Sequence, residues 1–197
     1  MNEAEEESRV KVNLIGEFGT GKTSLTQRYV DGYSHDYKSR IGIDFKAKNV
    51  IVEGKEIRVL IWEERLPAIY EMENLSYFRG SDACAFVFNL TSHDSFDCLK
   101  NKKEKVENVI ADDLNDYPFI LIGNKNDQHE LRDINRFEVE NWCQKEGIRS
   151  YFETSAETGD KVDEAFSELV RLALIHHKSY DFKMKELAAK EPFDESE

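Results

Sequence analysis

The eight residues from Gly16 to Thr23 have the types and spacing of a loop that binds phosphate groups. Glycines such as Gly16, Gly19 and Gly21 let successive backbone N–H groups approach one anion. Lys22 can reach the β- and γ-phosphates of a nucleotide, and the Thr23 hydroxyl can bind Mg²⁺. An apolar run precedes the segment and a helical pattern follows it, as this motif requires. The predicted phosphate-binding residues are Gly16, Gly19, Thr20, Gly21, Lys22, Thr23 and Ser24.

That loop does not distinguish ATP from GTP, but the segment from Asn124 to Asp127 does. The Asp127 carboxylate can accept two parallel hydrogen bonds from the N1–H and N2–H₂ edge of guanine. Adenine has no such donors and would leave a buried carboxylate unpaired, at a cost of about 1–3 kcal/mol. The Lys125 stem can lie along the base, and the backbone N–H of Ala156 can donate to guanine O6. The predicted guanine-binding residues in these segments are Asn124, Lys125, Asp127, Ser155 and Ala156.

Apolar runs alternate with helical patterns along the chain, which is typical of an α/β fold. Strands are predicted at residues 10–15, 44–52, 57–62, 83–89, 119–123 and 150–153, and helices at 22–30, 93–110, 136–146 and 162–177. A turn at residues 53–55 joins the second and third strands as a hairpin. We therefore predict a mostly parallel sheet with one antiparallel strand and helices on both faces. Each motif follows a strand, where such sheets bind ligands.

The chain has 197 residues and a net charge of −13, which suits one domain without a basic surface for nucleic acid. Its three widely spaced cysteines are typical of free thiols in a reducing compartment. No apolar run approaches the roughly 20 residues that cross a bilayer, and MNEAEEES is no signal peptide. We predict a cytoplasmic protein with an acidic arm at 1–8, one domain at 9–177 and an acidic tail at 178–197. Residues 182–189 of that tail could extend the last helix.

The sequence resembles a small GTPase of the Ras superfamily, most of all the Rab branch, over residues 9–177. The stretches that carry the resemblance are GKTSLTQRYVDGY at 21–33, IGIDFKAK at 41–48, LIW at 60–62, YFRGSDA at 77–83, GNKND at 123–127 and YFETSAETGDKVDEAF at 151–166. The resemblance implies the small G domain fold of P-loop NTPases, with a six-stranded sheet, and GTP or GDP bound with Mg²⁺. It also implies that Tyr33 packs against the guanine edge. Phe45, Trp62 and Tyr77 would form an aromatic triad read by protein effectors or regulators, although ordinary core packing explains these three residues equally well.

The departures from the Rab pattern surround the γ-phosphate. Arg40 replaces the Thr that binds Mg²⁺ and the γ-phosphate, and an arginine cannot be a Mg²⁺ ligand. Glu63 replaces an Asp, so only a displaced Mg²⁺ contact through water is expected. Leu66 and Pro67 replace the Gly that meets the γ-phosphate and the Gln that orients the attacking water. Phe18 adds a ring where the family has a small residue, and it should crowd the attacking water or an arginine finger.

These substitutions leave no catalytic residue of the family intact, so they predict a Rab-like guanine-nucleotide-binding protein with impaired GTP hydrolysis. It would act as a regulator or effector-binding module in vesicle traffic or signalling, with similar affinity for GDP and GTP. Two alternatives stay open: a switching GTPase that depends on a dedicated activator, with Glu64 positioning the water, and an interaction module with structurally bound nucleotide. The end of the sequence, EPFDESE, lacks the cysteines that carry prenyl groups in Rab proteins. We therefore expect no direct lipid anchor and membrane association only through a partner.

Overall fold

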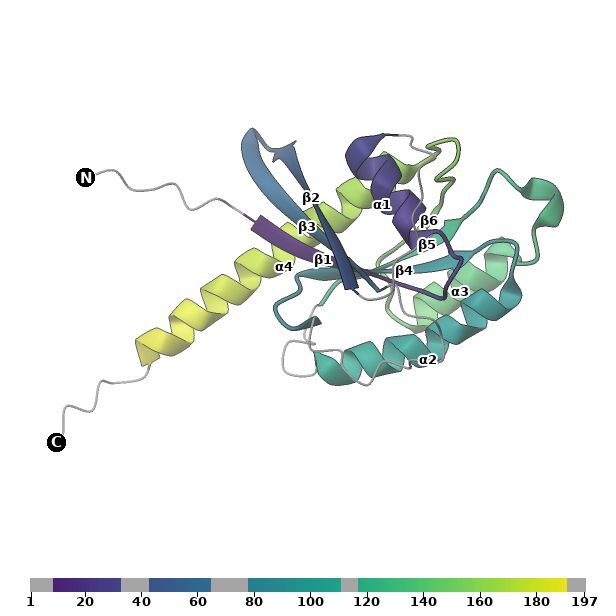
Figure 1. Cartoon of the computed structure of the whole chain (residues 1–197). Helices are drawn as coiled ribbons and strands as arrows, with labels where there is room; N and C mark the ends of the chain where they lie inside the picture. Colours follow the sequence, from purple (N-terminus) through teal and green to yellow (C-terminus); the bar gives the residue numbers. More distant parts are fainter. Residues whose placement is uncertain (1–8, 33–42, 65–77, 111–116, 191–197) are drawn as a thin grey trace.

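The fold is built on one six-stranded sheet with the strand order β2-β3-β1-β4-β5-β6 (Figure 1). The structure is a computed structural model that describes residues 9–32, 43–64, 78–110 and 117–190. The strands are β1 (Arg9–Ile15), β2 (Ile43–Val52), β3 (Lys55–Glu64), β4 (Ala83–Asn89), β5 (Phe119–Asn124) and β6 (Ser150–Glu153). Only the β2–β3 pair is antiparallel among these strands. The predicted sheet is therefore confirmed.

Helices cover both faces of the sheet and enclose two apolar cores (Figure 1). They are α1 (Lys22–Asp31), α2 (His93–Val109), α3 (Arg136–Lys145) and α4 (Val162–Lys190), together with the short 3₁₀ helix η3 (His129–Leu131). On one face α1 and α4 meet where the ring of Tyr29 stacks on that of Phe166, with ring centroids 4.2 Å apart. On the other face α2 and α3 cover β4 and β5, and Phe88 packs against Phe96. This layering leaves the carboxyl ends of the parallel strands clear for the loops that follow them.

The hairpin of β2 and β3 has the expected turn but is longer than the sequence predicts. Glu53 and Gly54 both have positive φ, 52° and 77°, which is the backbone of a tight hairpin turn. Strand β3 runs from Lys55 to Glu64, whereas apolar alternation predicted only residues 57–62. Its ends stay paired with β2, Lys55 opposite Val52 and Glu64 opposite Ile43. Pairing with β2 therefore extends the strand into polar residues, which an apolar alternation pattern does not detect.

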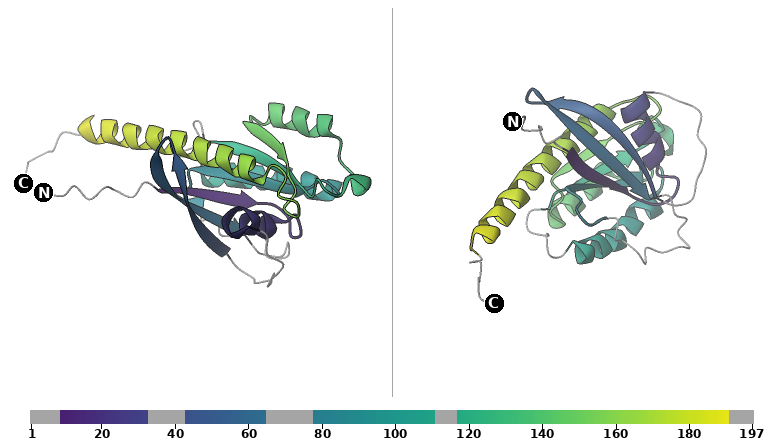
Figure 2. Two further views of the ribbon diagram at one scale, coloured as in Figure 1. Left: turned by 90° about the horizontal axis from the view of Figure 1, so that it is seen from above. Right: turned by 60° about the vertical axis from the view of Figure 1, so that its left-hand side comes forward.

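Helix α4 is 29 residues long and continues past the sheet (Figures 1 and 2). His177 anchors this helix to the domain, with its Nδ1 2.8 Å from Asp82 Oδ1. The other carboxylate oxygen of Asp82 accepts the backbone N–H of Lys11 at 2.7 Å, so the residue just before β4 joins β1 to α4. Beyond it the helix extends to Lys190 on the side where β1 begins. None of the helices in the described ranges is both long and apolar enough to cross a membrane.

Candidate nucleotide-binding site

The loop between β1 and α1 leaves the N-terminus of α1 without a protein cap. Gly21 precedes the helix with φ 94° and has no side chain to cap it, and the first turn of α1 contains no acidic residue. By contrast, α2 and α3 begin with the side-chain caps Ser92 and Asn135, each followed by an acid in the first turn. The uncapped N–H groups and positive dipole end of α1 therefore suit an external anion.

Lys22 places its ammonium group against the loop. Its Nζ donates to the carbonyl oxygens of Gly16 at 2.8 Å and Glu17 at 2.9 Å, and the side chain is largely buried. The Oγ1 of the buried Thr20 also donates to Glu17 O, at 2.9 Å. Ser24, by contrast, is exposed on α1. The predicted phosphate-binding residues therefore lie around one loop, with a cation held at its inner side.

Two glycines of this loop allow an approach that any side chain would block. A Cβ on Gly16 would lie 2.0 Å from the backbone oxygen of Val87, and one on Gly21 would lie 2.2 Å from Asn124 Nδ2. Gly19 also has positive φ, 82°, but faces open space. The loop is thus held close to the ends of β4 and β5, which brings it to the second predicted motif.

Asn124, at the end of β5, joins the phosphate loop to the predicted base-binding loops. Its Nδ2 donates to Thr20 O at 3.0 Å. Its Oδ1 accepts the backbone N–H of Ala156 at 3.1 Å and the hydroxyl of Thr154 at 3.3 Å. The sequence predicts that the same Ala156 N–H donates to guanine O6. To bind the base, this N–H would therefore have to be shared between Asn124 Oδ1 and guanine O6, or move from one to the other. One buried side chain nevertheless fixes three loops relative to one another.

Asp127 and Ser155 meet at the outer side of this junction. The Ser155 hydroxyl donates to Asp127 Oδ1 at 2.6 Å, which orients the carboxylate. The Asp127 side chain is exposed, whereas the sequence argument took it as buried. No described protein segment covers it, so the base itself would have to exclude water there. Lys125 has a left-handed backbone with φ 69°, an uncommon conformation for a residue with a side chain.

Arg28 is a contact of this site that the sequence did not reveal. Its Nε donates to Ala156 O at 2.8 Å, and its guanidinium also donates to Glu157 O. The side chain therefore ties α1, which follows the phosphate loop, to the loop that would read the base. Arg28 lies three residues after Leu25 and directly before Tyr29, and both of these side chains are buried on α1. This position beside the buried face is the feature of the sequence that could have indicated a contact for its long polar side chain.

The predicted metal-binding residues are in direct contact. Thr23 Oγ1 donates to Glu63 Oε2 at 2.7 Å, and both side chains are buried. A hydroxyl and a carboxylate are the hard oxygen donors that Mg²⁺ prefers, so this pair fits the metal. Within the described ranges no group of three or more His, Cys, Asp or Glu side chains could hold a metal ion. A Mg²⁺ ion here would therefore need oxygens from water and phosphate.

An ion pair precedes and supports the loop that is predicted to bind the base. Arg132 donates to both oxygens of Glu153 at 3.1 and 2.5 Å, and Tyr151 Oη donates to Oε1 at 2.9 Å. Burial alone would raise the pKa of Glu153, but the hydrogen bonds from Arg132 and Tyr151 outweigh it and lower that pKa. Glu153 directly precedes Thr154, so its position sets where the loop begins.

We predict that Glu153→Gln weakens the fold at neutral pH and removes part of its acid sensitivity. Because the folded-state pKa of Glu153 lies below the unfolded value, its contribution is present above the unfolded pKa, about 4.3. It is lost as the pH falls through the lower folded pKa. We expect a cost of about 1–2 kcal/mol at pH 7. Thermal unfolding between pH 3 and 7 measures this, and the melting temperatures of the variant and the unmodified protein should converge at low pH. The control is Glu104→Gln, because Glu104 is exposed on α2. A constant difference across this range would contradict the assignment.

Four predicted site residues, Tyr33, Leu66, Pro67 and Tyr77, lie outside the described residues, and so does Arg40. The other two members of the predicted aromatic triad are in contact: the rings of Phe45 and Trp62 stack with centroids 5.4 Å apart. Phe45 is 59% exposed, and Lys11 Nζ lies 4.9 Å from the Trp62 ring centroid. Phe18 is also exposed, at the rim of the phosphate loop.

The chain is similar in sequence to known proteins of the Ras family. The model of the Ras family matches residues 11–175. The chain is 33% identical to the Ypt/Rab-type GTPase Rab7 of Neurospora crassa over 176 residues, which cover 88% of this chain and 86% of that protein. It is 36% identical to the Ras-related protein Rab7 of Cenchrus ciliaris over 169 residues, covering 84% and 82%. It is 33% identical to the GTP-binding protein YPTC5 of Chlamydomonas reinhardtii over 179 residues, covering 89% and 87%.

Proposed function

The chain belongs to the Ras family, as a small GTPase of the Rab type, and from this premise we propose that it binds GTP and GDP as a regulator of vesicle traffic and hydrolyses GTP poorly. The phosphate loop would hold the α- and β-phosphates, and Asp127 would read the guanine. The groups that sense the γ-phosphate in the family are replaced in this sequence. The protein would therefore bind a nucleotide firmly and change little when the third phosphate is lost.

The observation that carries the binding proposal is the position of Asn124. Its amide holds the phosphate loop through Thr20 O at 3.0 Å and the loop of Ala156 at 3.1 Å. A nucleotide has its base and phosphates at opposite ends of a ribose, so its site must fix two loops at a set separation. A side chain that binds both loops supports such a ligand, whereas a glycine-rich turn that merely caps a helix needs no such tie.

The metal is expected to bind more weakly than in a typical relative. Thr23 and Glu63 would hold Mg²⁺, Thr23 through its hydroxyl and Glu63 through water, and the ion would neutralise charge on the phosphate oxygens. Glu63 has one methylene more than the Asp of the family pattern, and its carboxylate contacts Thr23 directly at 2.7 Å. Arg40 supplies no oxygen where the pattern has a Thr. These two substitutions support a weakened Mg²⁺ site.

Poor hydrolysis is proposed from two substitutions, Leu66 and Pro67, and from the exposed ring of Phe18. Leu66 and Pro67 lack the backbone freedom and the amide side chain that position the water. Loss of water positioning alone costs about two or more decades in rate. Phe18 lies within the phosphate loop and is 66% exposed, and we expect its ring to crowd the side chain that an activator would insert.

We expect GDP and a non-hydrolysable GTP analogue to bind with dissociation constants within about tenfold of each other, with Mg²⁺ or with EDTA. The reason is that the contacts that favour the third phosphate are missing, whereas those to the base and first two phosphates are kept. Titration of fluorescent nucleotides into nucleotide-free protein measures this. A strong preference for the GTP analogue with a strict need for Mg²⁺ would contradict the proposal.

Single-turnover hydrolysis distinguishes the proposal from an ordinary switching GTPase. The unmodified chain is expected to convert bound GTP too slowly to matter on the time scale of trafficking, and Pro67→Gln tests whether the missing amide is the cause. Rapid turnover by the unmodified chain would favour the switch, with another side chain such as Glu64 in the role of the glutamine. Extraction and chromatography of the copurified nucleotide shows which ligand the protein carries.

Protein effectors or regulators are proposed to bind at the stacked pair Phe45 and Trp62. Phe45 is largely exposed although its ring is apolar, and Lys11 adds a cation over the Trp62 ring at 4.9 Å. A partner protein that covers the two stacked rings would bury their apolar surface, and buried aromatic side chains often contribute most to binding. Recruitment to a membrane through such a partner stays a prediction.

A further inference from the structure

A groove between α2 and α3 lies apart from the nucleotide-binding residues. Its cavity has a volume of about 490 Å³ and is lined from α2 by Phe96 and Lys100 and from α3 by Phe137, Glu138, Trp142 and Lys145. On α3, Glu138, Trp142 and Lys145 are four and three residues apart, so they share one face of the helix, and Phe137 lies beside that face. We call this set of residues the α2–α3 groove.

The floor of the groove is aromatic, and so is one lip. The rings of Phe96 and Trp142 meet edge to face with centroids 5.3 Å apart, and both side chains are buried. Phe137, five residues before Trp142 on α3, is 70% exposed. An exposed phenyl ring beside an open cavity with an aromatic floor can be covered by an apolar side chain from outside.

Two lysines, Lys100 and Lys145, line the groove in a chain whose net charge is −13. Lys145 has no ion pair or hydrogen bond with any side chain that the structure describes, and it projects from the last turn of α3. Lys100 pairs with Asp97 at 2.6 Å, and its Nζ lies 5.5 Å from the Phe96 ring centroid. Because exposed ion pairs are weak, a carboxylate from outside can compete for this lysine. The remaining charged side chain of the lining, Glu138, already has a partner.

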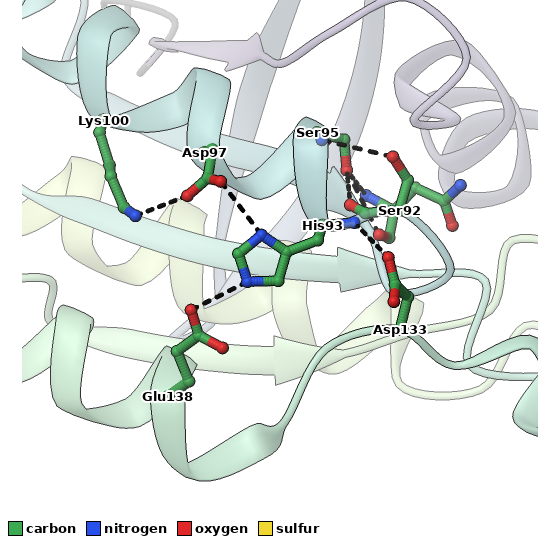
Figure 3. A network of polar contacts seen from close by, with 8 residues as sticks. Ser92, His93, Ser95, Asp97, Lys100, Asp133 and Glu138 are labelled. Atoms are coloured by element: carbon green, nitrogen blue, oxygen red, sulfur yellow. Dashed lines mark hydrogen bonds and ion pairs between the residues drawn. The ribbon is translucent and has the colours of Figure 1, made fainter.

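That partner is His93, at the start of α2 (Figure 3). Its Nε2 lies 3.1 Å from Glu138 Oε1, and its Nδ1 lies 3.1 Å from Asp97 Oδ2. Desolvation alone would lower the pKa of His93, but the two carboxylates outweigh it and raise that pKa. The imidazole therefore bridges Asp97 on α2 and Glu138 on α3 and fixes α3 beside α2.

We propose that the α2–α3 groove binds a peptide segment of a partner protein that carries an aromatic or large aliphatic side chain next to a carboxylate. The apolar side chain would lie against Phe96 and Trp142 under Phe137, and the carboxylate would meet Lys145 and Lys100. The volume holds one or two large side chains but no folded domain, which favours an extended segment.

The groove is separate from the proposed effector surface. Phe45 and Trp62 lie on β2 and β3 at one edge of the sheet, whereas α3 contacts β6 at the other edge. A partner could thus hold the groove while another protein binds Phe45 and Trp62. This inference does not depend on the bound nucleotide.

A charge-reversal experiment tests the groove. Random 12-residue peptides displayed on phage are selected on the purified protein, and a winning peptide is labelled and titrated. We expect the winners to share an apolar residue beside Asp or Glu. Lys145→Glu should weaken the labelled peptide by about tenfold or more and should favour its counterpart with Lys in place of the acid. Phe137→Ser should weaken both peptides, and because both replaced side chains are exposed, both variants should fold.

Lys55→Glu, in the β2–β3 hairpin, is the matched control and should bind the peptide as the unmodified chain does. Selection without the shared pattern, or equal affinity in all variants, would overturn the proposal. So would self-association that Lys145→Glu abolishes, which would assign the groove to a second copy. Displacement of the peptide by indole-3-acetate at equal concentration would assign it to a small anionic ligand instead. Copurified nucleotide should be unchanged in every variant, which separates this test from that of the proposed function.

Discussion

Asp127→Asn is expected to change the preferred base from guanine to xanthine. The carboxylate of Asp127 can accept from both N1–H and N2–H₂ of guanine, whereas an amide accepts one and turns its NH₂ toward the other. Xanthine has a carbonyl oxygen in place of the amino group, so it suits the amide. Hydrogen bonds to a charged group contribute about 1.5–3 kcal/mol each, so GDP affinity should fall about 100-fold or more.

Titration of the variant with fluorescent GDP and xanthosine diphosphate measures this change. The Ser155 hydroxyl, which donates to Asp127 Oδ1 at 2.6 Å, can orient an amide oxygen in the same way, so the fold should be preserved. Glu130→Gln is the control, because it removes an exposed carboxylate from the neighbouring η3 helix. Unchanged GDP affinity in Asp127→Asn would show that another group reads the base.

Gly21→Ala should abolish nucleotide binding and lower the stability of the domain. The residue has φ 94°, where a side chain costs about 1–2 kcal/mol. Its Cβ would also lie 2.2 Å from Asn124 Nδ2, so that amide must move. Asn124 would then lose its bonds to Thr20 and Ala156, and we expect a total loss of about 3 kcal/mol or more.

Thermal unfolding and the nucleotide content of the purified variant report the two effects. The control is Gly54→Ala in the β2–β3 hairpin, where φ is 77° but a Cβ would meet no atom within 4 Å. It should show only the backbone cost, with normal nucleotide content. If Gly21→Ala behaves like Gly54→Ala, Asn124 is not the tie between the loops.

The strand pattern was predictable because it depends on local sequence. Strands β4 and β5 are almost wholly buried, and a strand covered on both faces needs the continuous apolar run that the sequence has there. The ends of β3 were not predictable in this way. Lys55 and Glu64 are in the strand because β2 lies beside them, which is a property of the pairing and not of their own hydrophobicity.

The candidate site divides along the same line. The phosphate loop and the segment from Asn124 to Asp127 are contiguous motifs, so their residue types and spacing identify them. Arg28 reaches a carbonyl 128 residues away, and Asn124 reaches one 104 residues away. Such partners follow from how the strands are ordered in the sheet, which a motif does not encode. The direct bond between Thr23 and Glu63 likewise depends on β1 and β3 lying side by side.

Helix α4 continues past His177 as a rigid extension of the domain. Thirteen further helical residues, 178–190, at about 1.5 Å each, set Lys190 roughly 20 Å from the anchor at Asp82. In a flexible chain of equal length, the position of Lys190 would vary widely relative to the sheet. In a continuous helix, the orientation of the domain fixes the position of Lys190. A pair of spin labels, one on α4 near Lys190 and one on the sheet, should accordingly give a narrow distribution of distances.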